Sequence, residues 1–268
     1  MNNDLEFKKK IVVGLMMTFA LLLFFCGGMS VYEQQKQVND ALQAGMDASE
    51  ENTDSDEESE IEIKPVDPNQ PMIALTFDDG PGLGTERLVE TLKSHGARAT
   101  FFMMGKRVNT YPDAVRKMVE TGCEIANHTT NHLKLTDYAA EGIAAEINST
   151  SEAINQIVGQ MPTMVRPPYG AVNEVVQSVA GAPLVFWSID TLDWELKDAA
   201  LIRDYVLNTV KDGDIVLMHD IYETTVQATI ELIPLLQERG YQLVTVSEMA
   251  KARGVTLENG VKYYNFYK

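Results

Sequence analysis

From residue 71 onward, short apolar runs alternate with segments whose apolar residues recur three and four positions apart. The apolar runs are rich in β-branched and aromatic residues and predict strands, whereas the amphipathic segments predict helices. Strands are expected at 72–77, 99–103, 124–126, 164–165, 183–189, 214–218 and 241–246. Helices are expected at 85–94, 112–121, 137–158, 199–210, 224–237 and 247–250, with Asp137 as the cap of the third.

Repeated strand-then-helix units of this length require parallel strands joined by crossover helices, so the pattern predicts an α/β fold. Seven such units between residues 71 and 252 are too few for an eight-stranded barrel and indicate a compact, incomplete (β/α) barrel. The periodicity alone is also compatible with a doubly wound open sheet. In a barrel, the chemistry is expected at the carboxyl ends of the strands.

The N-terminus has a different pattern. A lysine cluster at 8–10 precedes an uncharged, mostly apolar run at 11–31. At ~1.5 Å per residue this run can cross a hydrocarbon layer of ~30 Å as a helix, and the lysines place the N-terminus inside. We therefore interpret residues 1–31 as a cytoplasmic tip and an uncleaved single-pass anchor. A cleaved signal peptide and a lipoprotein site at Cys26 are the alternatives, but no Ala-x-Ala site follows, and bulky Phe25 precedes the cysteine.

Residues 32–70 are expected to be a disordered, acidic extracellular linker. Between residues 40 and 62 there are ten Asp or Glu and no Lys or Arg. Such a segment has too little apolar surface to fold, and the prolines at 65–71 stiffen the approach to the domain. The folded domain is accordingly expected to occupy residues 71–268.

Composition narrows the classes of partner. The net charge of −17 argues against a nucleic acid, because phosphate binding needs clustered Lys and Arg. A hydrophobic content of 45% is ample for a core. The two cysteines, Cys26 and Cys123, lie in very different segments, so no structural disulfide is expected between them.

Titratable side chains collect where the predicted strands end. Two adjacent carboxylates, Asp78 and Asp79, follow the first strand and repel each other there, which is costly for a mere turn. Later strand ends carry His128 and His132, then Arg166-Pro167-Pro168-Tyr169, then Asp190 and Asp193-Trp194, and finally His219-Asp220. Three of the four histidines thus fall on one predicted rim, while His95 falls at a helix end.

The spacing of His128 and His132 suggests a metal site. On a helical turn, residues four apart share one face, so both imidazoles could bind one cation. With a carboxylate from another strand end they form a His2Asp set with one open position, which is typical of catalytic zinc. Water in that position can act as a nucleophile near neutral pH.

These motifs, with Thr76-Phe77 before the aspartates and Leu217-Met218 before His219, resemble the five ordered motifs of the polysaccharide deacetylases. This is the NodB-homology domain of carbohydrate esterase family 4. The resemblance covers about residues 70–252 and implies a distorted (β/α)7 barrel. With its apolar N-terminal run, the whole sequence resembles the membrane-anchored peptidoglycan N-acetylglucosamine deacetylases of this family.

The resemblance implies a metal centre beside a general base. Asp79, His128 and His132 would bind a divalent metal. Zn²⁺ is the expected ion, and the same ligands accept Co²⁺, Ni²⁺ or Mn²⁺. Asp78 would be the general base for the attacking water, kept ionised and oriented by Arg166.

The remaining motif residues would act on the leaving group and the acetyl group. His219 would be the general acid that protonates the leaving amine, with its pKa raised by Asp193. The backbone N–H of Tyr169 would stabilise the oxyanion. Trp194, Leu217 and Pro168 would form the pocket for the acetyl methyl.

We therefore expect metal-dependent hydrolysis of N-acetyl groups from a cell-wall polysaccharide, most simply peptidoglycan N-acetylglucosamine, with release of acetate. The alternatives are an O-acetyl esterase acting on a xylan-like glycan and a chitin or poly-N-acetylglucosamine deacetylase. A non-catalytic glycan-binding module would have lost the base or a ligand, and all are present. The catalytic domain is expected to be monomeric and to lie on the outer face of the cell membrane.

Overall fold

The computed structural model describes residues 65–268. The predicted membrane span at 11–31 and most of the predicted linker lie outside the described residues. Within residues 65–268, no helix combines the length and the apolar character needed to cross a membrane.

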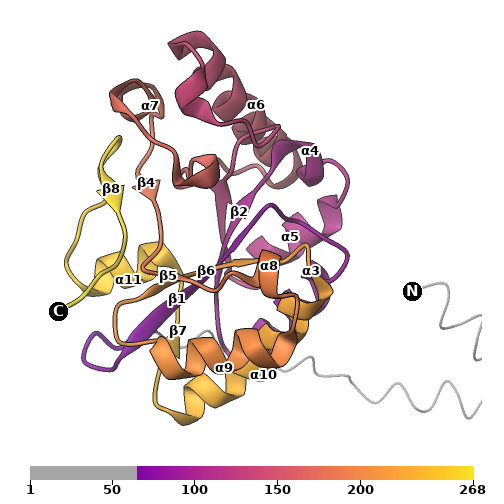
Figure 1. Cartoon of the computed structure of the whole chain (residues 1–268), viewed down its shortest axis with the longest axis vertical. Coiled ribbons are helices and arrows are strands. Elements are labelled where there is room, and N and C mark those ends of the chain that lie inside the picture. The colour runs from indigo at the N-terminus through magenta and orange to yellow at the C-terminus, as the bar shows by residue number, and fades with distance from the viewer. Residues whose placement is uncertain (1–64) are drawn as a thin grey trace, which may run out of the picture. The chain divides into compact units, whose positions relative to one another are not determined.

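A parallel sheet forms the centre of the described domain (Figure 1). Its strands are β1 (Met72–Asp78), β2 (Thr100–Met103), β3 (Glu124–Asn127), β5 (Ile189–Asp190) and β6 (Ile215–His219), in the order β3-β2-β1-β6-β5, and β7 (Gln242–Leu243) pairs with the start of β1. Every residue of the central strand β1 is buried, which explains its unbroken apolar run. The predicted α/β fold with parallel strands is confirmed.

A second, two-stranded sheet continues the arrangement beyond β3. It pairs β4 (Leu184–Val185) with β8 (Lys262–Tyr263). Val165 bridges Asn127 of β3 on one side and Leu184 of β4 on the other. The strand predicted at 183–189 is therefore wrong as a single element: its first part pairs with β8, and the chain then turns so that β5 can pair with β6. The strands thus form two sheets that Val165 connects. The parallel strands of the expected barrel are present, but they do not form one continuous barrel sheet.

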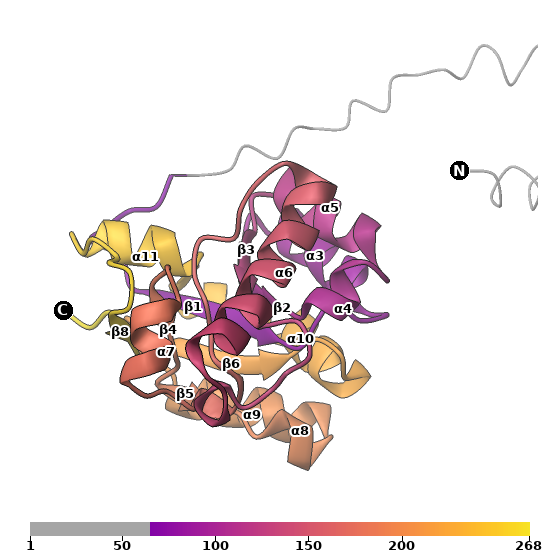
Figure 2. The same cartoon turned by 90° about the horizontal axis from the view of Figure 1, so that it is seen from above.

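Helices surround the strands, as the view from above shows (Figure 2). The longer helices are α3 (Thr85–Ser94), α5 (Pro112–Glu120), α6 (Ala140–Val158), α9 (Ala199–Thr209), α10 (Glu223–Glu238) and α11 (Val246–Ala252). Shorter turns are α4 (Gly105–Val108), η1 (Leu135–Asp137), η2 (Pro168–Gly170), α7 (Glu174–Val179) and α8 (Asp193–Leu196). On α3 the buried face is Leu88, Val89 and Leu92, as its apolar spacing predicts.

Two boundary predictions are wrong for local reasons. Asp137 belongs to the turn η1 and does not cap α6, which begins after Ala139 without a side-chain cap. The last predicted strand is shortened to β7 because Thr245 starts α11. The Thr245 hydroxyl accepts from the Glu248 N–H at 3.1 Å, and the Glu248 carboxylate accepts from the Thr245 N–H at 2.9 Å. This capping box fixes the end of the strand.

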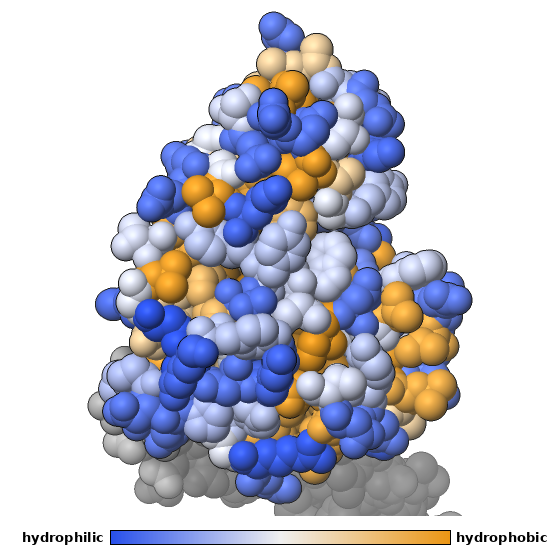
Figure 3. Space-filling model, turned by 60° about the vertical axis from the view of Figure 1, so that its left-hand side comes forward, coloured by the Kyte–Doolittle hydropathy of each residue, from blue (hydrophilic) through white to orange (hydrophobic). Residues whose placement is uncertain are grey.

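The main apolar core lies between the sheet and its helices. Phe77 of β1 stacks on Phe101 of β2 with ring centroids 5.1 Å apart. Cys123 is a buried free thiol within this core. On the face drawn in Figure 3, hydrophilic residues prevail and hydrophobic residues form separate groups among them. The fold thus buries its apolar strands and leaves their carboxyl ends for polar chemistry.

Candidate active site

The register between β1 and β6 brings two predicted catalytic residues together. Asp78 ends β1 and is paired in register with His219, which ends β6. Neighbouring strands lie ~4.8 Å apart, so these two residues are neighbours at the carboxyl edge of the sheet. The two residues are well over a hundred positions apart in the sequence, and the parallel pairing of β1 with β6 brings them close together.

Asp79 leaves the strand with an unusual backbone conformation. In a strand, successive side chains point to opposite faces, so Asp78 and Asp79 would normally diverge. Asp79 instead has a φ of 68°, in the left-handed region that side-chain-bearing residues seldom adopt. The chain turns at this residue, and both carboxylates lie within 3.7 Å of His128 Nε2.

The segment from His128 to His132 is a loop, and the helical turn assumed for it is wrong. Thr129 and His132 both have positive φ values, 63° and 58°. The two imidazoles nevertheless meet, with ring centroids 5.0 Å apart. The shared direction that a helix would provide is achieved here by two left-handed residues.

Hydrogen bonding fixes the tautomer of His128. Its Nδ1 lies 2.6 Å from the carbonyl oxygen of Arg166, which can only accept, so Nδ1 carries the proton. Burial lowers the pKa of His128 to about 3, so the ring is neutral near pH 7. Its Nε2 lone pair is therefore free to bind a cation.

Asp79, His128 and His132 form a cluster that fits one metal ion. Their ligand atoms lie within 4.8 Å of one another. Asp79 Oδ1 is 3.6 Å from His128 Nε2 and 3.4 Å from His132 Nε2, and ligand atoms on one tetrahedral ion lie ~3.3–3.5 Å apart. Asp79 Oδ1 is also buried without a hydrogen-bond partner in the described part of the chain. A cation would satisfy this oxygen, as the predicted ligand set requires.

Arg166 lies directly behind Asp78. Its guanidinium is fully buried and donates to Asp78 Oδ1 at 2.7 Å. The same side chain donates to the Thr76 hydroxyl at 2.9 Å and to two main-chain carbonyls. Burial raises the pKa of Asp78 above its usual 3.8, and the Arg166 charge opposes that rise. The pair is the one expected from the sequence, with one carboxylate oxygen left for other contacts.

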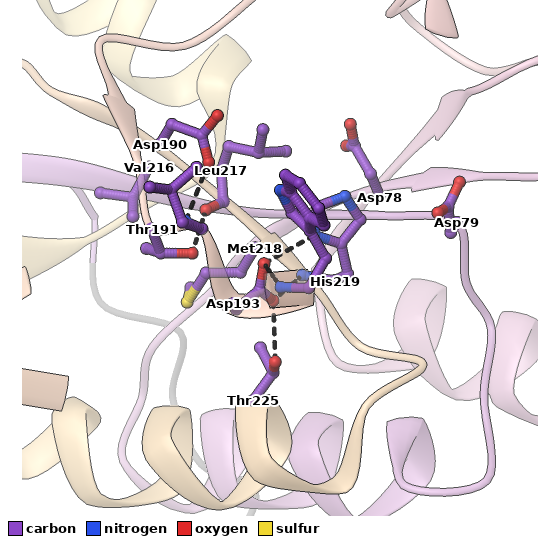
Figure 4. Close-up of polar contacts among 12 residues, drawn as sticks. Asp78, Asp79, Asp190, Thr191, Asp193, Val216, Leu217, Met218, His219 and Thr225 are labelled. Carbon is purple, nitrogen blue, oxygen red and sulfur yellow. Dashed lines mark hydrogen bonds and ion pairs between the residues drawn. The ribbon is translucent and has the colours of Figure 1, made fainter. Parts of the chain in front are cut away.

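Asp193 holds His219 from the side opposite Asp78 and Asp79 (Figure 4). The His219 ring donates from Nδ1 to Asp193 Oδ1 at 2.7 Å, which leaves Nε2 for the cavity. Asp193 Oδ2 accepts from the His219 N–H and from the Thr225 hydroxyl, both at 2.7 Å. Because Asp193 is completely buried, these bonds lock both the carboxylate and the imidazole it orients.

The pKa of His219 is raised from 6.5 to about 9. Burial by itself lowers this pKa, but the hydrogen bond and charge of Asp193, with the charges of Asp78 and Asp79, outweigh the burial. The imidazolium therefore persists at neutral pH and is lost as the pH rises through about 9.

Asp193→Asn should move the alkaline limb of the kcat/KM profile to lower pH by at least about one unit. The amide removes the negative charge that favours the imidazolium, whereas the burial that lowers the pKa remains. Rates measured between pH 6 and 10, on the two proteins in parallel, test this. An alkaline limb at the same pH in both proteins would show that His219 is not the acid whose titration the profile reports.

The cavity at this edge has a volume of about 450 Å³. Asp78, Asp79, His128, His132 and His219 all line it. Trp194 and Leu217, the predicted pocket residues, line it as well. Pro168 does not: it is buried, and Pro167 takes its place on the wall. Tyr169, Trp187, Asp190 and Tyr222 complete the lining.

The backbone N–H and the ring of Tyr169 have different surroundings. Its φ is 60° and the residue is 68% exposed, with the ring packed edge-on against His132 at a centroid distance of 4.6 Å. The N–H groups of Gly170 and Ala171 bond back to Pro167 and Pro168. No backbone carbonyl of the described residues accepts from the Tyr169 N–H. This donor is thus left available next to the cavity.

One supporting residue was not predicted from the sequence, and a second was predicted only as the strand-end neighbour of His219. Thr225 holds Asp193 from the start of α10, and nothing in its own surroundings signals that role. Asp220 is buried beneath the turn that follows Asp79, where it accepts from the Thr85 hydroxyl. A Cβ at Gly80 would lie 2.2 Å from Asp220 Oδ1, so a larger residue there would displace the Asp220 carboxylate. The glycine of the Asp78-Asp79-Gly80 turn was the one available clue.

Comparisons with known proteins agree with this geometry. The family model described as polysaccharide deacetylase matches residues 66–183. The peptidoglycan-N-acetylmuramic acid deacetylase PdaC of Bacillus subtilis is 41% identical over 189 residues, which are 70% of this chain and 40% of PdaC. A peptidoglycan-N-acetylglucosamine deacetylase of Bacillus cereus is 37% identical over 192 residues, which are 68% of this chain and 90% of that protein.

A solved structure shows the same likeness in three dimensions. The T48 deacetylase with substrate is 42% identical to this chain and matches it with a TM-score of 0.71, over 74% of this chain and 99% of the other. The chain spans 40% of the length of PdaC, so the likeness to PdaC concerns one part of that protein.

Proposed function

From its membership of the polysaccharide deacetylase family, to which this chain belongs, we propose that it is a metal-dependent hydrolase of N-acetyl groups on a cell-wall glycan. One observation carries the proposal. Asp78 and His219, in register on adjacent strands, line one cavity together with the Asp79, His128 and His132 cluster. A base, an acid and a cation site thus surround one point.

The first chemical step needs a base close to the attacking water. Asp78 has one oxygen bonded to Arg166 and its other oxygen on the side of His128. Arg166 keeps the carboxylate oriented, and the pKa raised by burial makes it a better proton acceptor. Asp78 therefore takes the proton of the water that attacks the acetyl carbonyl carbon.

The developing negative charge on the carbonyl oxygen needs donors that are already in place. A divalent cation held by Asp79, His128 and His132 would polarise this carbonyl and make the attacking water more acidic. Zn²⁺ is the proposed ion, because two histidines and one carboxylate with an open position are a ligand set typical of catalytic zinc. The N–H of Tyr169 supplies a hydrogen bond to the same oxygen.

The second step breaks the C–N bond and releases an amine. An amine anion is a very poor leaving group, so the nitrogen must be protonated as the bond breaks. His219 carries that proton on Nε2, and Asp193 stabilises the charged ring until transfer. Trp194 and Leu217 line the cavity with apolar surface that suits the acetyl methyl.

The proposed substrate is peptidoglycan, deacetylated at its N-acetylglucosamine residues. The names of two relatives support the polymer but differ in the sugar: PdaC is a peptidoglycan-N-acetylmuramic acid deacetylase, and the Bacillus cereus protein acts on peptidoglycan N-acetylglucosamine. The proposed setting is the outer face of the cell membrane, reached through the apolar run at 11–31. A domain anchored there meets the wall directly.

Acetate release by the full chain tests the substrate. We compare three substrates at equal acetyl concentration: purified peptidoglycan, chitooligosaccharides and acetylxylan. The peptidoglycan products are then digested and identified by mass spectrometry. We expect the highest kcat/KM on peptidoglycan, with the free amine on glucosamine. If free amine were found only on muramic acid, N-acetylmuramic acid would be the substrate sugar instead. If acetate were released from acetylxylan alone, the protein would be an ester hydrolase and not an amide hydrolase.

A further inference from the structure

The loop between the two histidine ligands is tied to a neighbouring helix by one carboxylate. Glu146 of α6 accepts three hydrogen bonds from residues of this loop. Its Oε2 accepts from the main-chain N–H of Thr130 at 3.1 Å and of Asn131 at 2.8 Å. Its Oε1 accepts from the Asn131 side-chain amide at 2.8 Å. Both oxygens of Glu146 are thus used on the segment that joins His128 to His132.

Further contacts close the loop from the other sides. The Thr130 hydroxyl donates to the main-chain carbonyl of Glu146 at 3.0 Å and lies 2.9 Å from the Thr150 hydroxyl. The Thr129 carbonyl accepts from the Gly105 N–H at 3.0 Å. A Cβ at Gly105 would lie 2.6 Å from the Thr150 hydroxyl, so α4 and α6 pack closely around this point.

The loop needs such restraint because its backbone is strained. Thr129 and His132 both have positive φ, and Thr129 is β-branched, which makes the left-handed region especially unfavourable. Residues persist in such conformations only where their surroundings hold them. Without its acceptors, the loop would relax toward ordinary backbone angles and would move one imidazole away from the other.

We propose that Glu146 is a positioning residue for the metal centre. It contacts neither the cation site nor the cavity. It acts by fixing the loop so that His132 Nε2 stays 3.4 Å from Asp79 Oδ1, the separation that suits two ligands of one ion. This inference rests on the proposed metal site, and it does not depend on which glycan is hydrolysed.

Zinc affinity measured without substrate tests the proposal. The dissociation constant of the full chain for Zn²⁺ is determined by competition with a chromogenic chelator. Glu146→Ala should bind Zn²⁺ about 10- to 100-fold more weakly than wild type, as for other residues that orient metal ligands. Glu152→Ala is the matched control, because Glu152 is an exposed glutamate of the same helix, and its affinity should be unchanged.

Two conservative variants separate hydrogen bonding from charge. Glu146→Gln keeps a carbonyl at the same reach for both main-chain N–H donors, and the Asn131 amide can rotate to accept from the new NH₂ group. It should bind Zn²⁺ within about threefold of wild type. Glu146→Asp keeps the charge but withdraws it by ~1.5 Å, one methylene length, and should bind about tenfold more weakly.

The outcomes decide the proposal. The order wild type, Gln, Asp in falling affinity supports positioning through hydrogen bonds. The order wild type, Asp, Gln would show that Glu146 acts through its charge and would overturn it. Equal affinity in all variants, with only the thermal midpoint of the metal-free protein lowered, would also overturn it, because Glu146 would then serve folding alone. If the wild-type protein did not hydrolyse any of the glycans, the proposed function would be contradicted, but the zinc affinities would still test the role of Glu146.

Discussion

Replacing Asp78 by Asn should lower acetate release by about 10²- to 10⁴-fold, the range that general-base catalysis contributes, and should leave metal binding intact. The amide has the shape of the carboxylate and can still accept from Arg166, but it cannot take a proton from water. Asp78 is not a member of the cluster of ligand atoms formed by Asp79, His128 and His132, and one of its oxygens is already engaged by Arg166. The loss should therefore fall on kcat.

The matched control for this variant is Asp79→Asn, which changes the neighbouring carboxylate in the same way. Bound Zn²⁺, measured by elemental analysis after gel filtration, should stay near the wild-type level in Asp78→Asn and fall sharply in Asp79→Asn. If Asp78→Asn kept wild-type turnover, another group would be the base. If it lost its zinc along with its activity, Asp78 would belong to the ligand set.

His219→Ala should lower the rate of hydrolysis of N-acetyl amides by about 10²- to 10⁴-fold. It should barely change the rate of hydrolysis of an activated ester, p-nitrophenyl acetate. An amine must be protonated to leave, whereas p-nitrophenolate leaves as a stable anion. The imidazole donates to Asp193 and lines the cavity but is not one of the clustered metal ligands. Its removal therefore takes away the acid and leaves the cation site and Asp78 in place.

The two substrates are compared in one preparation, so the amount of folded, zinc-loaded protein cancels from the ratio. A fall in the amide-to-ester ratio of about 100-fold or more supports the role of His219 as the acid. Equal losses on both substrates would contradict it, because a general effect on folding, zinc or substrate binding lowers both rates alike.

Strand ends that line the cavity could be located from the sequence. Buried parallel strands appear as continuous apolar runs, so the ends of β1 and β6 could be located, and with them Asp78 and His219. The likeness to known motifs then assigned a role to each residue. Their proximity follows from strand order, which local periodicity does not encode.

Features that depend on tertiary packing could not be predicted. The strand at 183–189 is divided between two partners, and no local signal marks the division. The His128 to His132 segment has a helical spacing and yet forms a strained loop, because α4 and α6 hold it through Gly105 and Glu146. Such a conformation is determined by neighbours that are distant in the sequence.

The supporting residues were missed for a similar reason. Thr225 and Glu146 act through side chains that reach a strand end or a loop from another element, and the contact of Asp220 with Thr85 likewise joins separate elements. Each is an ordinary polar residue in its own segment. Only the three-dimensional arrangement shows that Thr225 holds the partner of the proposed acid and that Glu146 holds the loop of the proposed ligands.

A cation at Asp79, His128 and His132 should be required for hydrolysis, and acetate release from purified peptidoglycan measures that requirement. The full chain is stripped with a chelator, dialysed, and assayed as Zn²⁺ is added back. We expect negligible activity without metal and a rise in proportion to bound zinc, complete at about one ion per chain. Undiminished acetate release from the stripped protein, with no metal bound, would contradict it.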